Sequence, residues 1–466
     1  MFRKVNLVNV LLFALIASCC FSCRENHPAE QKAIVQKPEE MDAKVADNIK
    51  AVLSFAKNNE GKITDSITLS LFDIVNSFYQ QEDFRGMWSS KERWMPLADS
   101  MFLFIKNARY YGLYPEDYHH SELEKLRNKI GSDSMIRKDA ISWTKADLML
   151  SDAFMRTLKD LKEGRLVADS VSAILKNKYI DSFFVTHLRD SREKGSLISV
   201  FNTVEPVNAS YQALRNALKR FVDSMDTKKY LYINFPFKDS LSFVESLRKR
   251  LSQSGFGDPD HTSIDSSYIV SEIKKYQAKH GLKIDGKAGP KMIKALNNND
   301  NERFKRIAIT LDRYKRLPPL PEAYIWVNLP GFYLKLWSQD TVVLESKVIV
   351  GKPETRTPLL ISAISDMVTY PQWTIPESII KKDILPALKK DPGYLQKKGF
   401  SLVSNKGETV DPFTVDWSKY KTGIPWNVVQ GSGDDNALGV FKFNFNNPYS
   451  VYLHDTNQRY LFQNSE

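Results

Sequence analysis

A proline-rich break at residues 318–321 divides the chain into two parts with different hydrophobic patterns. Residues 301–314, before the break, are charged and helix-forming, and the prolines predict where that helix ends because a proline ring cannot continue it. Residues 324–328 and 332–336, after the break, are typical of β-strands. Since 466 residues are too many for one hydrophobic core, the sequence predicts a multidomain α+β fold.

The part of the chain before the break is mainly helical from residue 45 to about residue 226. Its clearest segment keeps one helical face apolar, through Leu150, Ala153, Phe154, Thr157, Leu158 and Leu161. Gly164 follows at a position where a glycine commonly ends a helix. We therefore expect a helical domain over residues 45–230.

The part after the break contains one stretch that predicts burial on both faces. Residues 342–350 are expected to form a third strand, and this strand ends in three consecutive apolar residues, 348–350. Residues 379–388 are rich in lysine and helix-prone, although Pro386 interrupts them. Residues 423–452 then return to strand patterns.

The N-terminus has the features of an export signal. A basic pair at residues 3–4 precedes an apolar stretch, residues 10–16, that is shorter than a membrane-spanning helix. Residues 16–19 read Ile-Ala-Ser-Cys and resemble a bacterial lipobox, whose cysteine becomes the lipidated first residue of the mature protein.

Cys19 is the expected lipidation site. Cys23 is a weaker alternative because Cys20 occupies the place where a lipobox has an aliphatic residue, and an ordinary signal peptide with chance cysteines is a third possibility. The lipoprotein hypothesis makes residues 1–18 a signal peptide and residues 19–44 a lipidated, flexible tether. The chain would then be anchored to a membrane of the cell envelope and face the periplasm.

The net charge and the positions of the cysteines limit the partners and the reactions that we expect. The net charge of +11 is spread along the chain without a nucleic-acid-binding motif, so we expect no nucleic-acid partner. The charge forms either a solvated basic surface or a surface for an anionic wall polymer or a membrane. All three cysteines lie in the N-terminal export region, so the folded part has no disulfide and no thiol. Because no histidines stand at the spacing of metal ligands, we expect neither a metal nor another cofactor.

Two short motifs near the C-terminus carry a family resemblance. Residues 436–439 read Asn-Ala-Leu-Gly, and residues 452–456 read Tyr-Leu-His-Asp-Thr. In this order they resemble the catalytic core of the L,D-transpeptidases, cysteine enzymes that cross-link peptidoglycan. The resemblance implies a mainly-β catalytic domain over residues 318–466, with a capping insertion that covers the active site.

Other motifs resemble further parts of the large members of that family. Residues 84–88, 111–118 and 147–154 look like signatures of its helical scaffold domain, and we assign them packing roles. Residues 273–290 resemble a peptidoglycan-binding type 1 module, which would extend over residues 231–300.

The residues of this module predict three helices. The first would include residues 243–251. The second would turn Ile273 and Tyr276 inward and end at Gly281, and Pro290 suits the first turn of the third. The resemblance implies that the module binds glycan, and a structural spacer that binds none is the alternative.

His454 is the expected catalytic residue. It follows the apolar strand 451–453, whose end would hold the imidazole rigidly and leave its ring free to reach a cleft. By resemblance it would activate a cysteine as a base and later protonate the leaving amine. A lone structural histidine is the alternative.

The substrate-binding side of this site is expected to comprise Gly439, Lys442, Asp455 and Thr456. Gly439 would let the backbone approach the substrate closely. Lys442 either lines the site or lies on the surface. Asp455 and Thr456 are expected to shape the turn after His454 rather than to react.

The family's nucleophile belongs to a Ser/Thr-x-Gly-Cys-x-Arg motif that follows the histidine. This sequence ends at Glu466, twelve residues after His454. We therefore expect a chain truncated before the catalytic cysteine and inactive as it stands, with the nucleophile beyond residue 466. The implied reaction joins peptidoglycan stem peptides by 3→3 cross-links through a cysteine thioester. The alternative is a non-catalytic, peptidoglycan-binding lipoprotein of the cell envelope.

Overall fold

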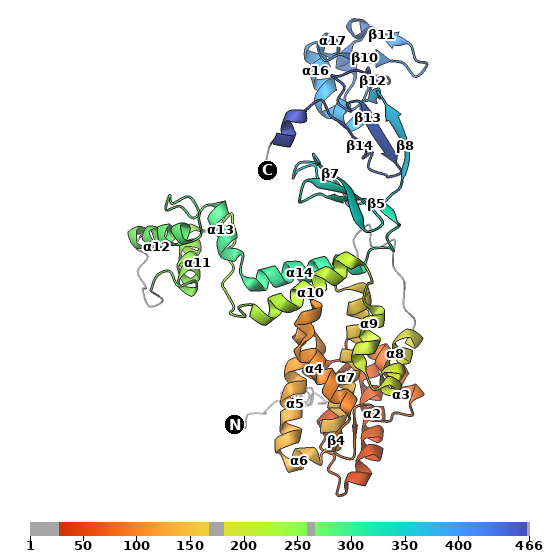
Figure 1. Ribbon diagram of the computed structural model, residues 1–466, viewed down its shortest axis with the longest axis vertical. Coiled ribbons are helices and arrows are strands. Elements are labelled where there is room, and N and C mark those ends of the chain that lie inside the picture. The colour runs from red at the N-terminus through yellow and green to blue at the C-terminus, as the bar shows by residue number, and fades with distance from the viewer. Residues whose placement is uncertain (1–27, 167–180, 259–265, 464–466) are drawn as a thin grey trace, which may run out of the picture. The chain divides into compact units, whose positions relative to one another are not determined.

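The computed structural model describes residues 28–166, 181–258 and 266–463. The described residues form two compact units, a helical one that ends at residue 317 and a strand-rich one that begins at residue 318 (Figure 1). The predicted mixture of helices and sheets is confirmed. Residues 1–18 and Cys19 lie outside the described residues. Among the helices of the described residues, none is both long and apolar enough to cross a membrane.

The first unit is built almost entirely from helices, with two small hairpins. Its helices before the predicted module are α2 (Met41–Lys57), α3 (Phe72–Gln81), α4 (Pro96–Lys106), α5 (His120–Ser132), α6 (Ser134–Arg137), α7 (Ala140–Glu163), α8 (Asp181–Lys194), α9 (Leu197–Val204) and α10 (Ala209–Ser224). The hairpins pair β1 (Lys62–Thr64) with β2 (Ile67–Thr68) and β3 (Ser89–Ser90) with β4 (Arg93–Trp94).

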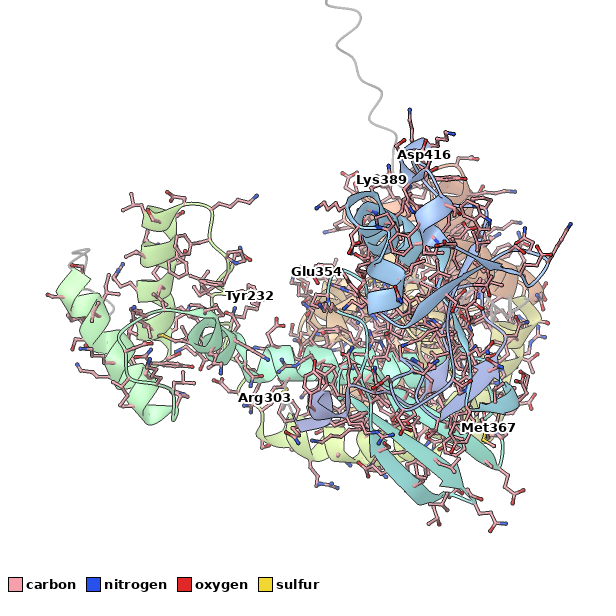
Figure 2. The ribbon with its side chains drawn as sticks, turned by 90° about the horizontal axis from the view of Figure 1, so that it is seen from above. Tyr232, Arg303, Glu354, Met367, Lys389 and Asp416 are labelled. Atoms are coloured by element: carbon pink, nitrogen blue, oxygen red, sulfur yellow. The ribbon has the colours of Figure 1, made fainter. Side chains whose placement is uncertain are left out.

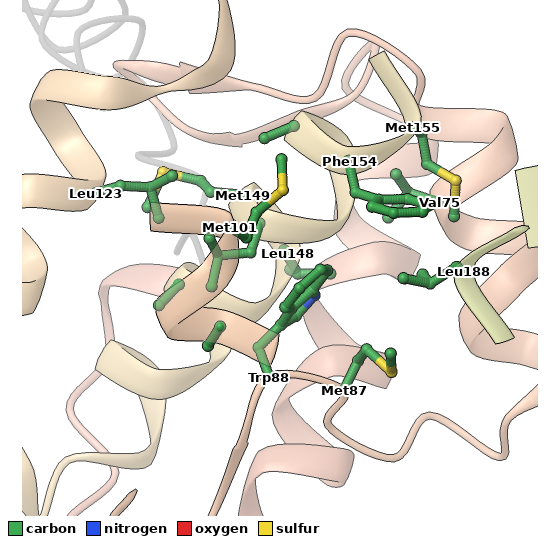
Figure 3. Packing of buried hydrophobic residues seen from close by; sticks show 14 of the residues in the cluster. Val75, Met87, Trp88, Met101, Leu123, Leu148, Met149, Phe154, Met155 and Leu188 are labelled. Atoms are coloured by element: carbon green, nitrogen blue, oxygen red, sulfur yellow. The ribbon is translucent and has the colours of Figure 1, made fainter. Parts of the chain in front are cut away.

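Helix α7 is the centre of this unit, and α2, α3, α4, α5 and α9 pack against it (Figure 1). The predicted apolar face is confirmed, because Leu150, Phe154 and Leu158 are fully buried. Gly164 ends the helix with a φ of +76°, as predicted. Figure 3 shows Phe154 near Trp88, and the two rings lie 6.2 Å apart.

Helix α7 also buries carboxylates, and these hold the surrounding loops in place. Asp152 accepts a hydrogen bond from the backbone N–H of Leu71 at 2.8 Å and contacts His119 at 2.7 Å. Asp160 accepts one from the Tyr118 hydroxyl at 2.8 Å. The loops are therefore fixed to α7 by polar contacts as well as by apolar packing.

Residues 28–44 do not form the flexible tether that their polar composition predicted. Ala29, Val35 and Met41 are buried in the core of the first unit. The backbone N–H of Ala33 donates to a carboxylate oxygen of Asp139, just before α7, at 2.8 Å. The tether expectation is therefore wrong from residue 28 onward, because a few apolar residues at the right spacing anchor an otherwise polar segment.

The predicted module is a three-helix unit, as expected. Its helices are α11 (Ser240–Gln253), α12 (Ser266–Lys279) and α13 (Pro290–Asn297). Ile273 and Tyr276 point into its core beside Leu251 and Ile293. Gly281 follows α12 with a φ of +64°, which confirms the predicted helix end.

Helix α14 (Asp300–Lys315) belongs to the scaffold rather than to the module. Its buried residues Phe304 and Leu311 pack with Tyr211 and Leu218 of α10. The scaffold is therefore formed by two stretches of the chain, with the module inserted between α10 and α14. The predicted scaffold domain ended at residue 230 and therefore did not include α14.

The second unit contains three small antiparallel sheets. Their strand orders are β5-β6-β7, β14-β13-β8 and β11-β10-β12-β9. The strands are β5 (Ala323–Asn328), β6 (Tyr333–Ser338), β7 (Thr341–Lys347), β8 (Ile364–Thr369), β9 (Trp373–Thr374), β10 (Phe400–Val403), β11 (Thr409–Val410), β12 (Asn427–Gln430), β13 (Phe441–Phe445) and β14 (Leu453–His454).

The expectation that the strand 342–350 is covered on both faces is wrong. Strand β7 ends at Lys347 and forms the edge of its sheet, and Ile349 is 46% exposed. The apolar run 348–350 lies after the end of the strand, so its composition does not indicate a strand that is covered on both faces.

The buried core of this unit lies in the region between β9 and β12. Leu388, Leu402, Trp417 and Val428 are among its members. Its helices are α15 (Glu377–Ile379), the π-helical turn η6 (Ile380–Ile384), α16 (Leu385–Lys390) and α17 (Tyr394–Lys397). The predicted helix 379–388 changes from the π-helical turn η6 to α16 just before Pro386, which lies in the first turn of α16.

Candidate active site around His454

His454 lies on the sheet β14-β13-β8. It is directly opposite Lys442 of β13, which in turn is opposite Val368 of β8. Residues directly opposite in an antiparallel pair point to the same face. The imidazole and the ammonium group therefore lie side by side on one face, and the side chain of His454 is exposed to solvent.

The ring of His454 is oriented by the backbone of the next residue. Its Nδ1 lies within hydrogen-bond distance of the carbonyl oxygen of Asp455. A carbonyl oxygen can only accept, so Nδ1 carries the proton and donates it. In the neutral ring Nε2 then holds the lone pair, and it is the nitrogen that can take a proton from another group.

The face around His454 is polar along β13 and β8. The Nζ of Lys442 lies 3.8 Å from the centre of the Tyr452 ring, a cation–π contact. Two residues along β13, the amide of Asn444 donates to Asp366 at 2.6 Å. Hydrogen bonds from the Ser365 hydroxyl and from Asn444, together with the charge of Lys442, lower the pKa of Asp366.

The opposite face of this sheet is aromatic. Phe441, Phe443 and Phe445 alternate with Lys442 and Asn444 along β13, and successive strand residues point to opposite faces. Phe441 is 44% exposed, and Met367, which faces Phe443 across the strands and is labelled in Figure 2, is 53% exposed. His454 thus belongs to the polar side of an amphipathic sheet.

Asp455 is held by the loop that precedes β13. Its Oδ2 accepts hydrogen bonds from the backbone N–H of Val440 at 3.3 Å and from Arg459 at 3.0 Å. Partial burial favours a higher pKa for Asp455, but the hydrogen bonds from Thr456, Arg459 and Val440 outweigh it and lower the pKa. Asp455 is therefore an ionised anchor for the end of β14.

Gly439 provides the space that this carboxylate occupies. It has a φ of +60°, and a Cβ on it would lie 2.5 Å from Cγ of Asp455. The space beside Gly439, where we expected a substrate to approach the backbone, is occupied by the Asp455 side chain. Thr456 shapes the turn, as expected, because its hydroxyl accepts from the backbone N–H of Gln458 at 3.0 Å.

Asn436 organises the same loop, a role that its sequence motif alone did not predict. It is 1% exposed, and its amide donates to the carbonyl oxygens of Gly431 at 2.7 Å and Pro371 at 3.1 Å. Its Oδ1 accepts from the backbone N–H of Leu438 at 2.7 Å. The sequence feature that could have indicated this role is an asparagine within an otherwise apolar motif. A buried side-chain amide usually forms hydrogen bonds to backbone groups.

The candidate site contains an oriented histidine, and the described residues around it supply no nucleophile of the expected kind. The residues that the structure describes include no cysteine, since all three lie before residue 28. The same residues hold no group of three or more His, Cys, Asp or Glu side chains placed to bind a metal ion.

Comparison with known families agrees with this division of the chain. Residues 322–466 match the family described as "L,D-transpeptidase catalytic domain", and residues 73–218 match "Scaffold domain". Residues 240–296 match "Putative peptidoglycan binding domain". The three matches lie in the same order as the scaffold, module and catalytic domains that the sequence resemblance predicted, and each of them covers about a third of the chain or less.

A curated relative carries the same family name. It is the "Putative L,D-transpeptidase" of Haemophilus influenzae (strain ATCC 51907 / DSM 11121 / KW20 / Rd), which is 37% identical over 158 residues. The match covers 34% of this chain and 32% of that protein, so the chain spans about a third of the length of this relative.

Proposed function

We propose that this protein is a peptidoglycan L,D-transpeptidase that forms 3→3 cross-links, with His454 as its general base. The observation that carries the proposal is the exposed imidazole of His454, whose Nδ1 is bound by the Asp455 carbonyl. It lies in the region that matches the catalytic-domain family. The nucleophile we propose is a cysteine encoded after Glu466, in the family's Ser/Thr-x-Gly-Cys-x-Arg motif.

The proposed reaction has two acyl-transfer steps. His454 takes the proton of the thiol, and the thiolate attacks the carbonyl carbon of the third residue of a tetrapeptide stem. The C–N bond breaks, the terminal D-alanine leaves with the proton from His454, and a thioester remains. A side-chain amine of a second stem then attacks the thioester and gives its proton to His454, and the thiolate leaves.

Lys442 and Asn444 are the proposed contacts for the substrate. They lie on the same face as His454, and Lys442 is directly opposite it. An ammonium group suits a carboxylate of the stem peptide, and an amide suits its peptide groups. Asp455, Gly439 and Thr456 support the base by fixing the end of β14.

The test is to sequence the gene past codon 466 and to express its whole reading frame. The protein is incubated with tetrapeptide muropeptides, and 3→3 dimers are measured by mass spectrometry. His454→Ala should lower the rate by about 10²–10⁴. His120→Ala, a histidine on α5, is the matched control and should keep the rate.

A second function follows from the module. Residues 240–296 match a peptidoglycan-binding family, so a non-catalytic wall-binding lipoprotein remains a candidate. A reading frame without the cysteine motif, or a full-length protein that binds sacculi and forms no dimer, would replace the transpeptidase proposal with this one.

We also propose that Cys19 is lipidated and anchors the protein to a membrane at the periplasmic side of the envelope. Metabolic labelling with a radioactive fatty acid should mark the wild-type protein and the Cys23→Ser variant. It should not mark Cys19→Ser. Labelling that depends on Cys23 instead would move the anchor to that residue.

A further inference from the structure

The segment that leads into α11 exposes an unusual number of large apolar side chains. Tyr232 is 57% exposed, Phe235 38%, Phe237 47% and Leu241 62%. We call residues 232–243 the aromatic loop. Figure 2 labels Tyr232 on it.

The backbone of the aromatic loop is fixed to the module. Ile233 is 2% exposed, its N–H donates to the side-chain oxygen of Asn297 at 3.0 Å, and its carbonyl accepts from the Asn297 amide at 2.8 Å. At the other end, the carboxylate of Asp239 accepts from the backbone N–H of Ser242 at 2.7 Å and caps α11. The exposed rings are thus held by a fixed segment at both ends.

The phenylalanine rings of the loop stack on one another. Phe237 lies over Phe243 with centroids 4.3 Å apart and an interplanar angle of 19°. Phe235 lies 6.2 Å from Phe237 and 6.3 Å from Phe243. Because Phe243 packs against the module core, it supports the exposed ring of Phe237 from below. Rings that already pack against one another lose less side-chain entropy when a ligand covers them than isolated exposed rings do.

We propose that the aromatic loop binds the sugar rings of peptidoglycan glycan strands. This inference rests on the proposed function, in which peptidoglycan is the partner, and it assigns a binding surface for the glycan. The face of a pyranose ring presents C–H groups with a partial positive charge, and an aromatic face carries a partial negative charge. Polar groups at the rim, such as the Tyr232 hydroxyl and Asn234, suit the sugar hydroxyls.

Charge around the loop favours the same ligand. Lys238 follows Phe237 in the chain, Lys229 precedes Tyr232 by three residues, and both lysines are exposed. Stem peptides attached to the glycan carry carboxylates, which attract such ammonium groups. The nearby acids are already engaged within the protein. Asp226 accepts from the Tyr230 hydroxyl at 2.7 Å, and Asp239 caps α11. A stable protein partner is disfavoured, because four side chains are far fewer than the roughly 20–30 residues that each side of such an interface contributes.

The experiment measures binding of the full chain to glycan strands that are released from sacculi by enzymatic removal of the stem peptides and then immobilised on beads. Tyr232→Ala and Phe237→Ala should each weaken binding roughly tenfold, the equivalent of about 1.4 kcal/mol. Phe237→Trp keeps an aromatic face and should bind like the wild type. The matched control is Ile284→Ala, a 57% exposed apolar residue elsewhere in the module, which should bind normally.

Far-UV circular dichroism on heating shows whether each variant still folds. Equal binding by wild type, Tyr232→Ala and Phe237→Ala would overturn the proposal. So would retention only of glycan that still carries its stem peptides. Cross-linking of soluble muropeptides should be unaffected by the loop variants, so failure of this proposal is distinguishable from failure of the transpeptidase proposal.

Discussion

Asp147 lies wholly inside the scaffold and yet accepts hydrogen bonds as a carboxylate. It receives the backbone N–H groups of Met87 at 2.9 Å and Trp88 at 2.9 Å, and the hydroxyl of Tyr79. Burial raises the pKa of Asp147 to about 6, against an ordinary value of 3.8, although these hydrogen bonds oppose the rise. The folded state therefore binds this proton more tightly than the unfolded state does.

The raised pKa of Asp147 predicts a loss of stability between about pH 4 and pH 6. The contribution of Asp147 to the free energy of unfolding is greatest below pH 4. It falls by about 3 kcal/mol between pH 4 and pH 6 and is constant at higher pH. Asp147→Asn cannot ionise, so the free-energy difference in unfolding between wild type and variant should shrink by that amount from pH 4 to pH 7. Urea unfolding at several pH values measures it, and a pH-independent difference would contradict the assignment.

The contact between Gly439 and Asp455 predicts a strong effect of a single methyl group. Gly439→Ala would place its Cβ against the Asp455 carboxylate and also strain a residue with a φ of +60°. We expect the unfolding free energy of the second unit to fall by about 1–3 kcal/mol. Gly407→Ala is the control for backbone strain alone, since its φ is +85° and nothing lies within 4 Å. Equal losses in both variants would show that Asp455 is not the cause.

At the scale of elements, the joint between α7 and α14 depends on a buried lysine. The Nζ of Lys315 donates to the carbonyl oxygen of Asp160 at 2.9 Å and to Asp312 at 3.0 Å. Asp312 also accepts from the backbone N–H of Arg165 at 2.9 Å. These contacts fix the end of α14 against the end of α7.

Lys315→Met should therefore destabilise the scaffold by about 3–5 kcal/mol, because it leaves the buried carboxylate of Asp312 without its charged partner. Chemical unfolding followed by tryptophan fluorescence measures the loss. Lys305→Met, an exposed lysine on the same helix, should change stability by less than about 0.5 kcal/mol. Similar losses of unfolding free energy in both variants would show that helix propensity, rather than the buried contact, causes the loss.

The same joint shows what local patterns can and cannot predict. The apolar face of α7, its end at Gly164 and the three module helices follow from the spacing of neighbouring residues, and the structure has them all. The packing of Phe304 and Leu311 on α10 is a contact between residues far apart in the chain, and a charged helix gives no local sign of it. Residues 28–44 were misassigned for the same reason, since Asp139 holds them.

In the candidate site, the sequence predicted the position of His454 and the turn made by Thr456. It did not predict that Gly439 faces Asp455, or that Asn436 holds the loop through three backbone groups. Those relations depend on how two distant segments meet, and no spacing rule describes them.

At the scale of the whole molecule, the module is an insertion whose two ends meet. The backbone N–H of Asp226 donates to Asp300 at 3.0 Å, and the side-chain amide of Asn301 donates to the carbonyl of Lys228 at 2.9 Å. Insertions with adjacent ends can usually be removed without loss of the host domain.

Replacing residues 231–297 with a short Gly-Ser linker should therefore leave the scaffold folded and α14 in place. Replacing residues 231–315 also removes Phe304 and Leu311 and should cost about 4 kcal/mol or more, from the apolar area they bury. Calorimetry of both full-chain variants tests this. A scaffold that melts equally early in both would mean that the module itself is needed for folding.

The two adjacent ends of the module also determine how a pulling force on the module reaches the scaffold. A module held by two chain segments shares any pulling force between them and passes it to the helix pair α10 and α14, whose apolar side chains interlock. If the module grips the wall, we expect tension from the growing cell surface to load this helix pair rather than a single strand of backbone. Single-molecule stretching through the module would then show a higher rupture force than stretching through the chain ends.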